Sequence, residues 1–222
     1  GTGTDMTVAE LNALDDTTSG IITATLVTAA TADYSSLTDD NGNNVLTITI
    51  NDAASTSITA AALSTIGGKT DGVVTVTNAI VVTGTTAQLT AALVTANTLV
   101  VAGTATGTIS DADDVSIAAT ALSAIGGKTS GAITVTNAIV ITGTTAALTA
   151  ALVTAGTLVV VSDAKATISD AASTSIAATA LSAIGDKTTG VVTVTNAIAL
   201  SGTNTQLTAA LVTTASLVVA GT

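Results

Sequence analysis

The chain has 222 residues and a net charge of −11, from 15 acidic residues against four lysines. This charge excludes nucleic-acid binding, which needs clustered cations to displace counterions. The chain has no Cys and no His, so a disulfide framework, a zinc site and the usual nucleophile–base pairs are excluded as well. Apolar residues make up 47% of the chain and are almost all Ala, Val, Ile and Leu, which indicates a folded protein with a thin aliphatic core.

Polar residues interrupt every apolar stretch of the chain. Thr, Ser, Asn and Gly recur every few residues, so no run approaches the roughly 20 apolar residues of a membrane-spanning helix. We therefore expect no membrane insertion. The chain starts Gly1-Thr2-Gly3, and we expect it to be a block from a longer protein.

The sequence repeats itself with a period of 59 positions. The string that begins at Ile66 (Ile-Gly-Gly-Lys-Thr) returns at Ile125, and at Ile184 with Asp in place of the second Gly. Two longer strings follow the same step, and their starting residues are Thr75, Thr134 and Thr193, and Leu89, Leu148 and Leu207. Such strict periodicity predicts a repeat architecture in which each copy packs on its neighbours.

We expect one solenoid over 1–222, made of a diverged first copy at about 1–47 and three full copies. The full copies span about 48–106, 107–165 and 166–222. In the first copy, Met6–Gly20 aligns with Ile58–Gly72, about seven residues are then missing, and Val45–Asp52 is a strand. Thr7 and Glu10 have the spacing of a capping box at the start of a helix.

A full copy is expected to contain two coils, each with two strands and a short helix. The predicted strands are Ile133–Thr136, Ile139–Thr142, Leu158–Val161 and Ala166–Ser169. The first helix is capped by Thr144 or Thr145, with Leu148, Leu152 and Ala155 on one face. The second covers Ser175–Ile184, with Ile176, Ala180, Leu181 and Ile184 facing inward. Gly126-Gly127 ends the preceding copy of this second helix.

These elements predict an α/β solenoid of about seven coils, with strand-strand-helix units, stacked parallel strands and short helices. Stacked strands are about 4.8 Å apart, whereas a helix is about 10 Å across. We therefore expect successive helices to alternate between two faces, so that each helix layer advances by two strand spacings.

Three stretches carry a family resemblance: Gly20–Thr25, Asn44–Ala53 and Leu63–Thr70. They are similar to the tandem repeats of giant bacterial surface proteins, such as the giant repeat proteins of cyanobacteria. The resemblance covers nearly the whole chain. It implies an extracellular or cell-surface location and an extended structural or adhesive role, and it carries over no catalytic residues.

Acidic clusters are the candidate metal ligands. The stretch that contains Asp39, Asp40, Asn41 and Asn43 is interpreted as a polar turn or, alternatively, a calcium loop, since hard cations prefer several closely spaced oxygens. The cluster of Asp111, Asp113 and Asp114 precedes a predicted helix. We interpret it as a set of helix-capping carboxylates, with calcium binding as the alternative.

Two other motifs have structural interpretations. Gly67-Gly68-Lys69-Thr70 resembles the end of a phosphate-binding loop, but the first glycine of that motif is missing and these glycines end a helix rather than begin one. The four lysines, Lys69, Lys128, Lys165 and Lys187, are interpreted as residues at helix ends, where cations are favoured. A recurring Asn, at Asn78, Asn137 and Asn196, is expected to form a ladder of stacked corners.

Threonine pairs are spaced for an ice-binding face. They are Thr75/Thr77, Thr134/Thr136 and Thr193/Thr195. The aliphatic strands at Leu99–Ala102 and Leu158–Val161 are expected to interrupt this array.

The sequence therefore predicts a non-catalytic scaffold or spacer of a large surface protein, without cofactors. The alternative is a binding module that uses one face for calcium, a glycan, adhesion or ice. The expected partners are neighbouring repeats, and the strand that ends the chain suggests end-to-end self-association.

Overall fold

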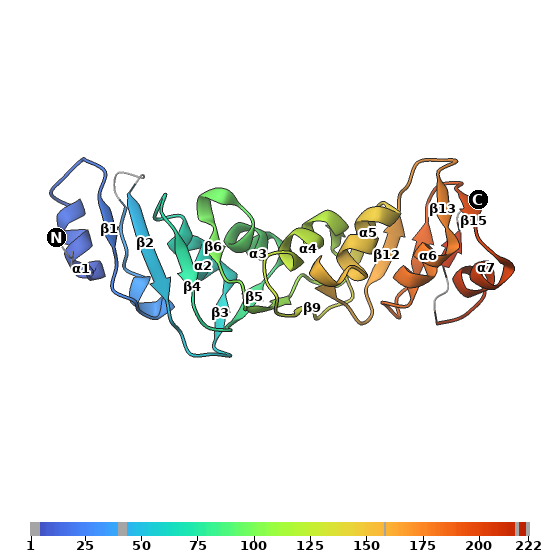
Figure 1. Cartoon of the computed structure of the whole chain (residues 1–222), viewed down its shortest axis with the longest axis horizontal. Coiled ribbons are helices and arrows are strands. Elements are labelled where there is room, and N and C mark those ends of the chain that lie inside the picture. Colours follow the sequence, from blue (N-terminus) through green and yellow to red (C-terminus); the bar gives the residue numbers. More distant parts are fainter. Residues whose placement is uncertain (1–4, 40–43, 158, 216–217, 221–222) are drawn as a thin grey trace. The chain divides into compact units, whose positions relative to one another are not determined.

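The computed structural model describes residues 5–39, 44–157, 159–215 and 218–220, and it has a mixed α/β fold with parallel sheets. Seven α-helices lie within these residues (Figure 1). The chain divides into two compact units. The first contains Gly1–Gly107 and Lys128–Gly131, and the second contains Thr108–Gly127 and Ala132–Thr222.

The first unit contains a four-stranded parallel sheet in the order β1-β2-β4-β6, and a parallel pair of β3 with β5. Its strands are β1 (Thr23–Thr25), β2 (Val45–Ile50), β3 (Ser57–Thr59), β4 (Val74–Val76), β5 (Val81–Gly84) and β6 (Val100–Val101). Its α-helices are α1 (Val8–Asp15), α2 (Ala60–Gly67) and α3 (Thr86–Leu93), and its 3₁₀ helices are η1 (Thr31–Tyr34) and η2 (Ala96–Thr98). Strand β7 (Thr106–Ile109) contains the division between the units.

The second unit contains a five-stranded parallel sheet in the order β8-β10-β12-β14-β16, together with the parallel pairs β9–β11 and β13–β15. Its strands are β8 (Ser116–Ala118), β9 (Ile133–Val135), β10 (Val140–Gly143), β11 (Val159–Val160), β12 (Lys165–Ile168), β13 (Ser175–Ala177), β14 (Val192–Val194), β15 (Ala199–Ser201) and β16 (Val218–Ala220). Its helices are α4 (Ala119–Gly126), α5 (Thr145–Leu152), α6 (Ala178–Gly185), α7 (Asn204–Leu211) and the 3₁₀ helix η3 (Ala155–Thr157).

Alternation of apolar and polar residues produces the buried faces of the strands. In β2, Leu46, Ile48 and Ile50 are fully buried, whereas Val45 and Thr47 are exposed. Helices α2, α4 and α6 contribute one leucine each at equivalent positions, and Leu63, Leu122 and Leu181 are all fully buried. The core residues are almost all Ala, Val, Ile and Leu, and Tyr34 is the aromatic residue among them.

The predicted elements of the repeat are found, with two corrections. The capping box of Thr7 and Glu10 is present at the start of α1, and Thr144 caps α5, as expected. Ala155, which was predicted to face inward, is exposed in η3, and Ala151 is buried instead because the helix ends at Leu152. The helix predicted at Ser175–Ile184 begins only at Ala178, because Ile176 pairs with Leu200 in a short strand.

This extra strand makes the two-coil description of a repeat wrong. From β8 at Ser116 to its copy β13 at Ser175, one repeat period later, the chain passes through five strands instead of four. In the second unit, successive strands alternate between the five-stranded sheet and the two parallel pairs. Since five is odd, a strand and its copy belong to different sheets. Strand β8 accordingly lies in the large sheet, whereas β13 pairs with β15.

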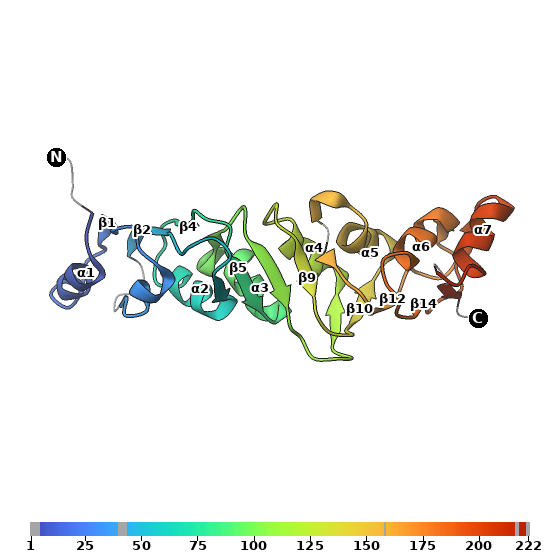
Figure 2. The ribbon, with the colours of Figure 1, turned by 90° about the horizontal axis from the view of Figure 1, so that it is seen from below.

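The sequence predicts that successive helices alternate between two faces, and this prediction is wrong, because consecutive helices pack against each other. Helix α2 packs against α3 in the first unit, and α4 packs against α5 and α6 against α7 in the second (Figure 2). In the second unit, α4 and α5 each follow a strand of the large sheet, whereas α6 and α7 each precede one. Helix α5 also packs against α6, so each helix of the second unit contacts the next one along the chain.

Candidate functional site

The acidic residues were the candidate metal ligands, and the structure describes some of them. Within residues 5–39, 44–157, 159–215 and 218–220, no group of three or more carboxylates is close enough to hold an ion. Asp39 is half-buried, and it lies beside Asp40, Asn41 and Asn43, which fall outside the described residues. Calcium binding at either acidic cluster stays a prediction, and melting curves with and without calcium test it.

The cluster of Asp111, Asp113 and Asp114 lies in the turn between β7 and β8, and the prediction that it caps the following helix is wrong. Helix α4 begins after Ala118, without a side-chain cap. Asp113 instead accepts a hydrogen bond from the backbone N–H of Ala138 (2.9 Å). The carbonyl of Asp111 accepts one from the Asn137 side chain (2.6 Å). These two hydrogen bonds join the turn before β8 to the corner at Asn137 and Ala138.

Asp114 has a second role as the partner of Lys165. Its Oδ1 lies 2.6 Å from the Lys165 Nζ, and both side chains are exposed. The hydrogen bond and the charge of Asp114 raise the pKa of Lys165 above its usual value. The pair therefore contributes a little stability below the usual lysine pKa, which is lost as the pH rises past the raised pKa. Lys165 lies in β12, so the prediction that all four lysines occupy helix ends holds only for the other three.

The recurring asparagines lie at corners, as predicted, but they bond to backbone rather than to one another. The side-chain amide of each donates to a carbonyl of the preceding turn. The pairs are Asn78 with Asp52 (2.8 Å), Asn137 with Asp111 (2.6 Å) and Asn196 with Asp170 (2.7 Å). The same turns contain a residue with positive φ, at Ser55, Asp114 and Ser173, and these positions follow the repeat period as well.

The Gly-Gly-Lys-Thr motif ends α2 and α4, as expected, and its threonine has a role that the sequence did not reveal. The Thr70 hydroxyl is buried, accepts hydrogen bonds from the N–H of Leu46 (2.6 Å) and Gly72 (2.8 Å), and lies 3.0 Å from the Asn44 carbonyl oxygen. The copies at Thr129 and Thr188 likewise donate to a backbone carbonyl, of Ala105 and Ala164 respectively. The motif therefore joins neighbouring backbone segments.

The glycine two positions later allows the same close approach. A Cβ atom on Gly72 would lie 2.0 Å from the Leu46 carbonyl oxygen, one on Gly131 2.2 Å from that of Ala105, and one on Gly190 2.3 Å from that of Ala164. The recurrence of these glycines at the repeat period could have indicated that they are structurally important. The sequence does not show which backbone segment lies against each glycine.

The threonine pairs considered for ice binding are interrupted as expected. In the sheet register, Thr75 pairs with Val101, Thr134 with Val160 and Thr193 with Val219. The hydroxyl of the second threonine in each pair already makes a hydrogen bond within the protein. The donors Thr77, Thr136 and Thr195 bond to the carbonyls of Ile50, Ile109 and Ile168 at 3.1–3.2 Å.

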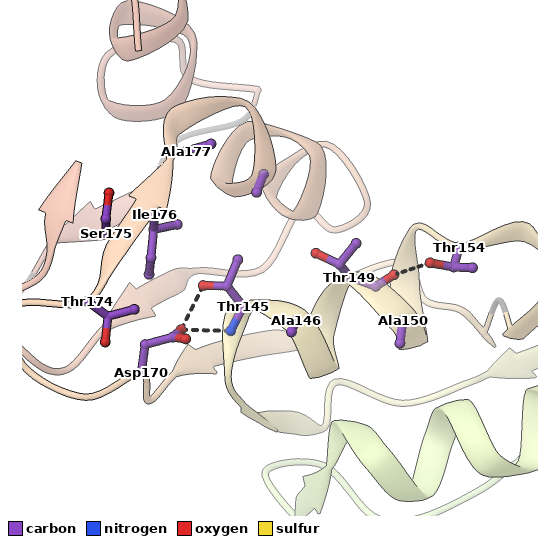
Figure 3. A pocket seen from close by; sticks show the side chains of 11 residues that line it. Thr145, Ala146, Thr149, Ala150, Thr154, Asp170, Thr174, Ser175, Ile176 and Ala177 are labelled. Atoms are coloured by element: carbon purple, nitrogen blue, oxygen red, sulfur yellow. Dashed lines mark hydrogen bonds between the residues drawn. The ribbon is translucent and has the colours of Figure 1, made fainter. Parts of the chain in front are cut away.

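A groove of about 490 Å³ lies in the second unit. One wall comes from α5 with Thr145, Thr149 and Ala150, and the other comes from Asp170 and the segment Thr174–Ala177 (Figure 3). Hydroxyl and methyl groups line it. Among the lining residues, Asp170 is the only ionisable one, and its carboxylate accepts hydrogen bonds from the Thr145 N–H and O–H, both at 2.7 Å.

Asp170 therefore acts as a cap on α5, supplied from a later part of the chain. We expect Asp170→Ala to destabilise the protein by about 1–2 kcal/mol, the usual cost of losing an N-terminal cap. Asp170→Asn, which keeps one acceptor oxygen, is expected to cost less. Urea denaturation followed by circular dichroism measures both. Asp163→Ala, in the exposed turn before β12, is the matched control and should stay within about 0.5 kcal/mol. An equal loss in the control would contradict the cap.

No family model, curated protein or solved structure matches the chain. In the described part of the chain, no helix is long and apolar enough to cross a membrane.

Proposed function

We propose that the chain is a structural repeat segment, a scaffold or spacer in a large extracellular or cell-surface protein, and that its copies stack as turns of one solenoid. The observation that carries the proposal is that the same contacts between backbone segments recur at the period of the sequence repeat. The buried threonine, the close glycine and the corner asparagine each recur with the repeat period, and each fastens one backbone segment to a neighbouring one.

The distribution of polar groups also favours a scaffold over a catalyst. The carboxylates of Asp113 and Asp170 bond to backbone N–H groups, and that of Asp114 pairs with an exposed lysine. Because these polar side chains bond to other parts of the protein, few polar side chains remain to bind a substrate. We therefore propose a non-catalytic protein without a cofactor. The proposed location rests on the resemblance to giant surface proteins, and the acidic surface is compatible with it.

The solenoid predicts how the length of the protein depends on its repeat number. Five strands per copy, with two strands per coil, give two and a half coils in each copy. At about 4.8 Å per stacked strand, each added copy should lengthen the molecule by about 12 Å. Small-angle X-ray scattering of variants with one, two and three extra copies of residues 107–165, inserted after Lys165, measures this increment.

A linear increase with constant cross-section supports the scaffold, because only stacked coils extend in one direction. The matched control is a Gly/Ser linker of equal length placed in the exposed turn between Ser162 and Asp163, which should leave the cross-section of the folded part unchanged and add a flexible segment. If each copy instead adds a separate globule, with its own unfolding transition, the stacking is wrong.

A further inference from the structure

Strand β13 has one open edge, and Thr174–Ala177 line the groove beside α5. Among the described strands, β13 pairs with β15 alone. The Thr174 carbonyl accepts a hydrogen bond from the Ala199 N–H (2.9 Å), so it points toward β15. Successive residues of a strand direct their backbone groups to opposite sides. The N–H and carbonyl of Ser175 and the N–H of Ala177 therefore point away from β15, and both residues are exposed.

The other wall of the groove is helix α5, which cannot complete the sheet, because the backbone groups of a helix bond within the helix. The side chains on this wall are short, and they include Ala146, Thr149 and Ala150 (Figure 3). The volume of about 490 Å³ is within the usual range of protein ligand pockets, about 300–1,000 Å³. The groove therefore combines an unpaired strand edge with open space next to it.

Asp170 places a negative charge at one end of the groove. It lies in the turn between β12 and β13, so it is at the N-terminal end of β13. Its Oδ2 accepts both hydrogen bonds from Thr145, whereas its Oδ1 has no hydrogen-bond partner in the described part of the chain. The lining residues include no lysine, and the chain has a net charge of −11. The groove therefore favours a partner with a cationic group.

The first copy of the repeat has the same strand edge without the same groove. Ser57 lies in β3, two repeat periods before Ser175, and β3 pairs with β5 alone among the described strands. The cavity between η1 and α2 in that copy measures about 170 Å³. Its lining contains Tyr34 and Leu37 but no residue of β3. The edge at Ser57 therefore serves as an internal control for the edge at Ser175.

We propose that the groove between α5 and β13 binds an extended peptide, which adds to β13 as a further strand. The N–H groups of Ser175 and Ala177 donate to peptide carbonyls, and the Ser175 carbonyl accepts from a peptide N–H. Alternate peptide side chains, β-branched such as Val and Thr, pack against the short side chains of α5. A peptide lysine donates to Asp170 Oδ1. This site goes beyond the scaffold role and does not depend on repeat stacking, because all its residues lie in the second unit.

The probe is the synthetic peptide Lys-Thr-Val-Thr-Val-Thr-Lys with blocked ends, titrated into the isotope-labelled full chain and followed by NMR. It has a lysine at both ends, so either strand direction places one at Asp170. Three hydrogen bonds and one ion pair predict a dissociation constant on the order of 1 mM or lower. The amide signals of Ser175 and Ala177 should shift and saturate, whereas that of Ser57 should not. A peptide with Glu in place of both lysines is expected to bind about tenfold more weakly.

A proline substitution tests the edge directly. Ser175→Pro removes an outward N–H at a position where an edge strand tolerates proline. We expect it to weaken peptide binding at least about tenfold, measured on the Ala177 signal, because it removes one hydrogen bond and adds a ring to the edge. The matched Ser57→Pro variant should bind with unchanged affinity. If Ser175→Pro does not fold, the signals of the parent chain decide.

Three results overturn the proposal. The first is a parent chain whose Ser175 and Ala177 signals do not respond to the peptide, or respond no more than that of Ser57. The second is a folded Ser175→Pro variant that binds the peptide as tightly as the parent. The third is a parent chain that is a dimer without peptide and that Ser175→Pro makes monomeric, since a second copy of the chain then occupies the edge.

Discussion

Gly72→Ala is expected to destabilise the protein by about 3 kcal/mol or more, because the new methyl group has no space. Its Cβ would lie 2.0 Å from the carbonyl oxygen and 2.7 Å from the nitrogen of Leu46, in the fully buried part of β2. Both are backbone atoms, so no side chain can rotate away. One of the two paired strands would have to move. Urea denaturation measured by far-ultraviolet circular dichroism gives the free energy of unfolding.

The chain supplies a control for this substitution in the same unit. A Cβ on Gly103 would have no atom within 4 Å, and the backbone there does not need a positive φ. Gly103→Ala is therefore expected to be neutral or to stabilise by up to about 1 kcal/mol, since alanine restricts the unfolded chain. Gly190→Ala and Gly156→Ala form the same pair in the second unit. Equal effects of the two substitutions in a pair would contradict the role assigned to the close glycine.

The sequence predicted the local elements well and their arrangement only partly. Thr7 with Glu10 and the alternation in β2 depend on neighbouring residues, so spacing alone was enough to identify them. The short strand at Ser175–Ala177 was missed because Ile176 is equally suited to the first turn of a helix, and only its partner Leu200 decides the outcome. That one strand changes the number of strands per repeat from four to five, and with it the sheet in which each copy lies.

The candidate site was predicted least well, because its contacts join distant parts of the chain. Asp170 and Thr145 are 25 residues apart, and nothing in their local sequence shows that the carboxylate caps α5. Asp113 and Asp114 look like helix caps from their position before α4, yet their partners are Ala138 and Lys165. The repeat period identifies which polar residues recur and are therefore expected to make structural contacts. Identifying what each one contacts requires the register between strands.

Thr70→Val is expected to cost about 2–5 kcal/mol, even though valine has nearly the same shape as threonine. The hydroxyl accepts hydrogen bonds from the N–H groups of Leu46 and Gly72. Valine leaves the buried Leu46 N–H and the half-buried Gly72 N–H without this acceptor, and a buried donor that loses its acceptor costs about 1–3 kcal/mol. Thr70→Ser keeps the hydroxyl and loses one methyl group, so it is expected to cost only about 1 kcal/mol.

The same Thr→Val exchange on the exposed face of β2 separates this effect from a change in strand preference. Thr47 lies next to Leu46 but is exposed, so Thr47→Val should change the free energy of unfolding by less than about 0.5 kcal/mol. Hydrogen exchange gives a second readout, since the amides of Leu46 and Gly72 should lose protection in Thr70→Val and keep it in Thr70→Ser. If Thr70→Val is as stable as the parent chain, the buried hydroxyl does not hold the two backbone segments together, and the main support for repeat stacking is lost.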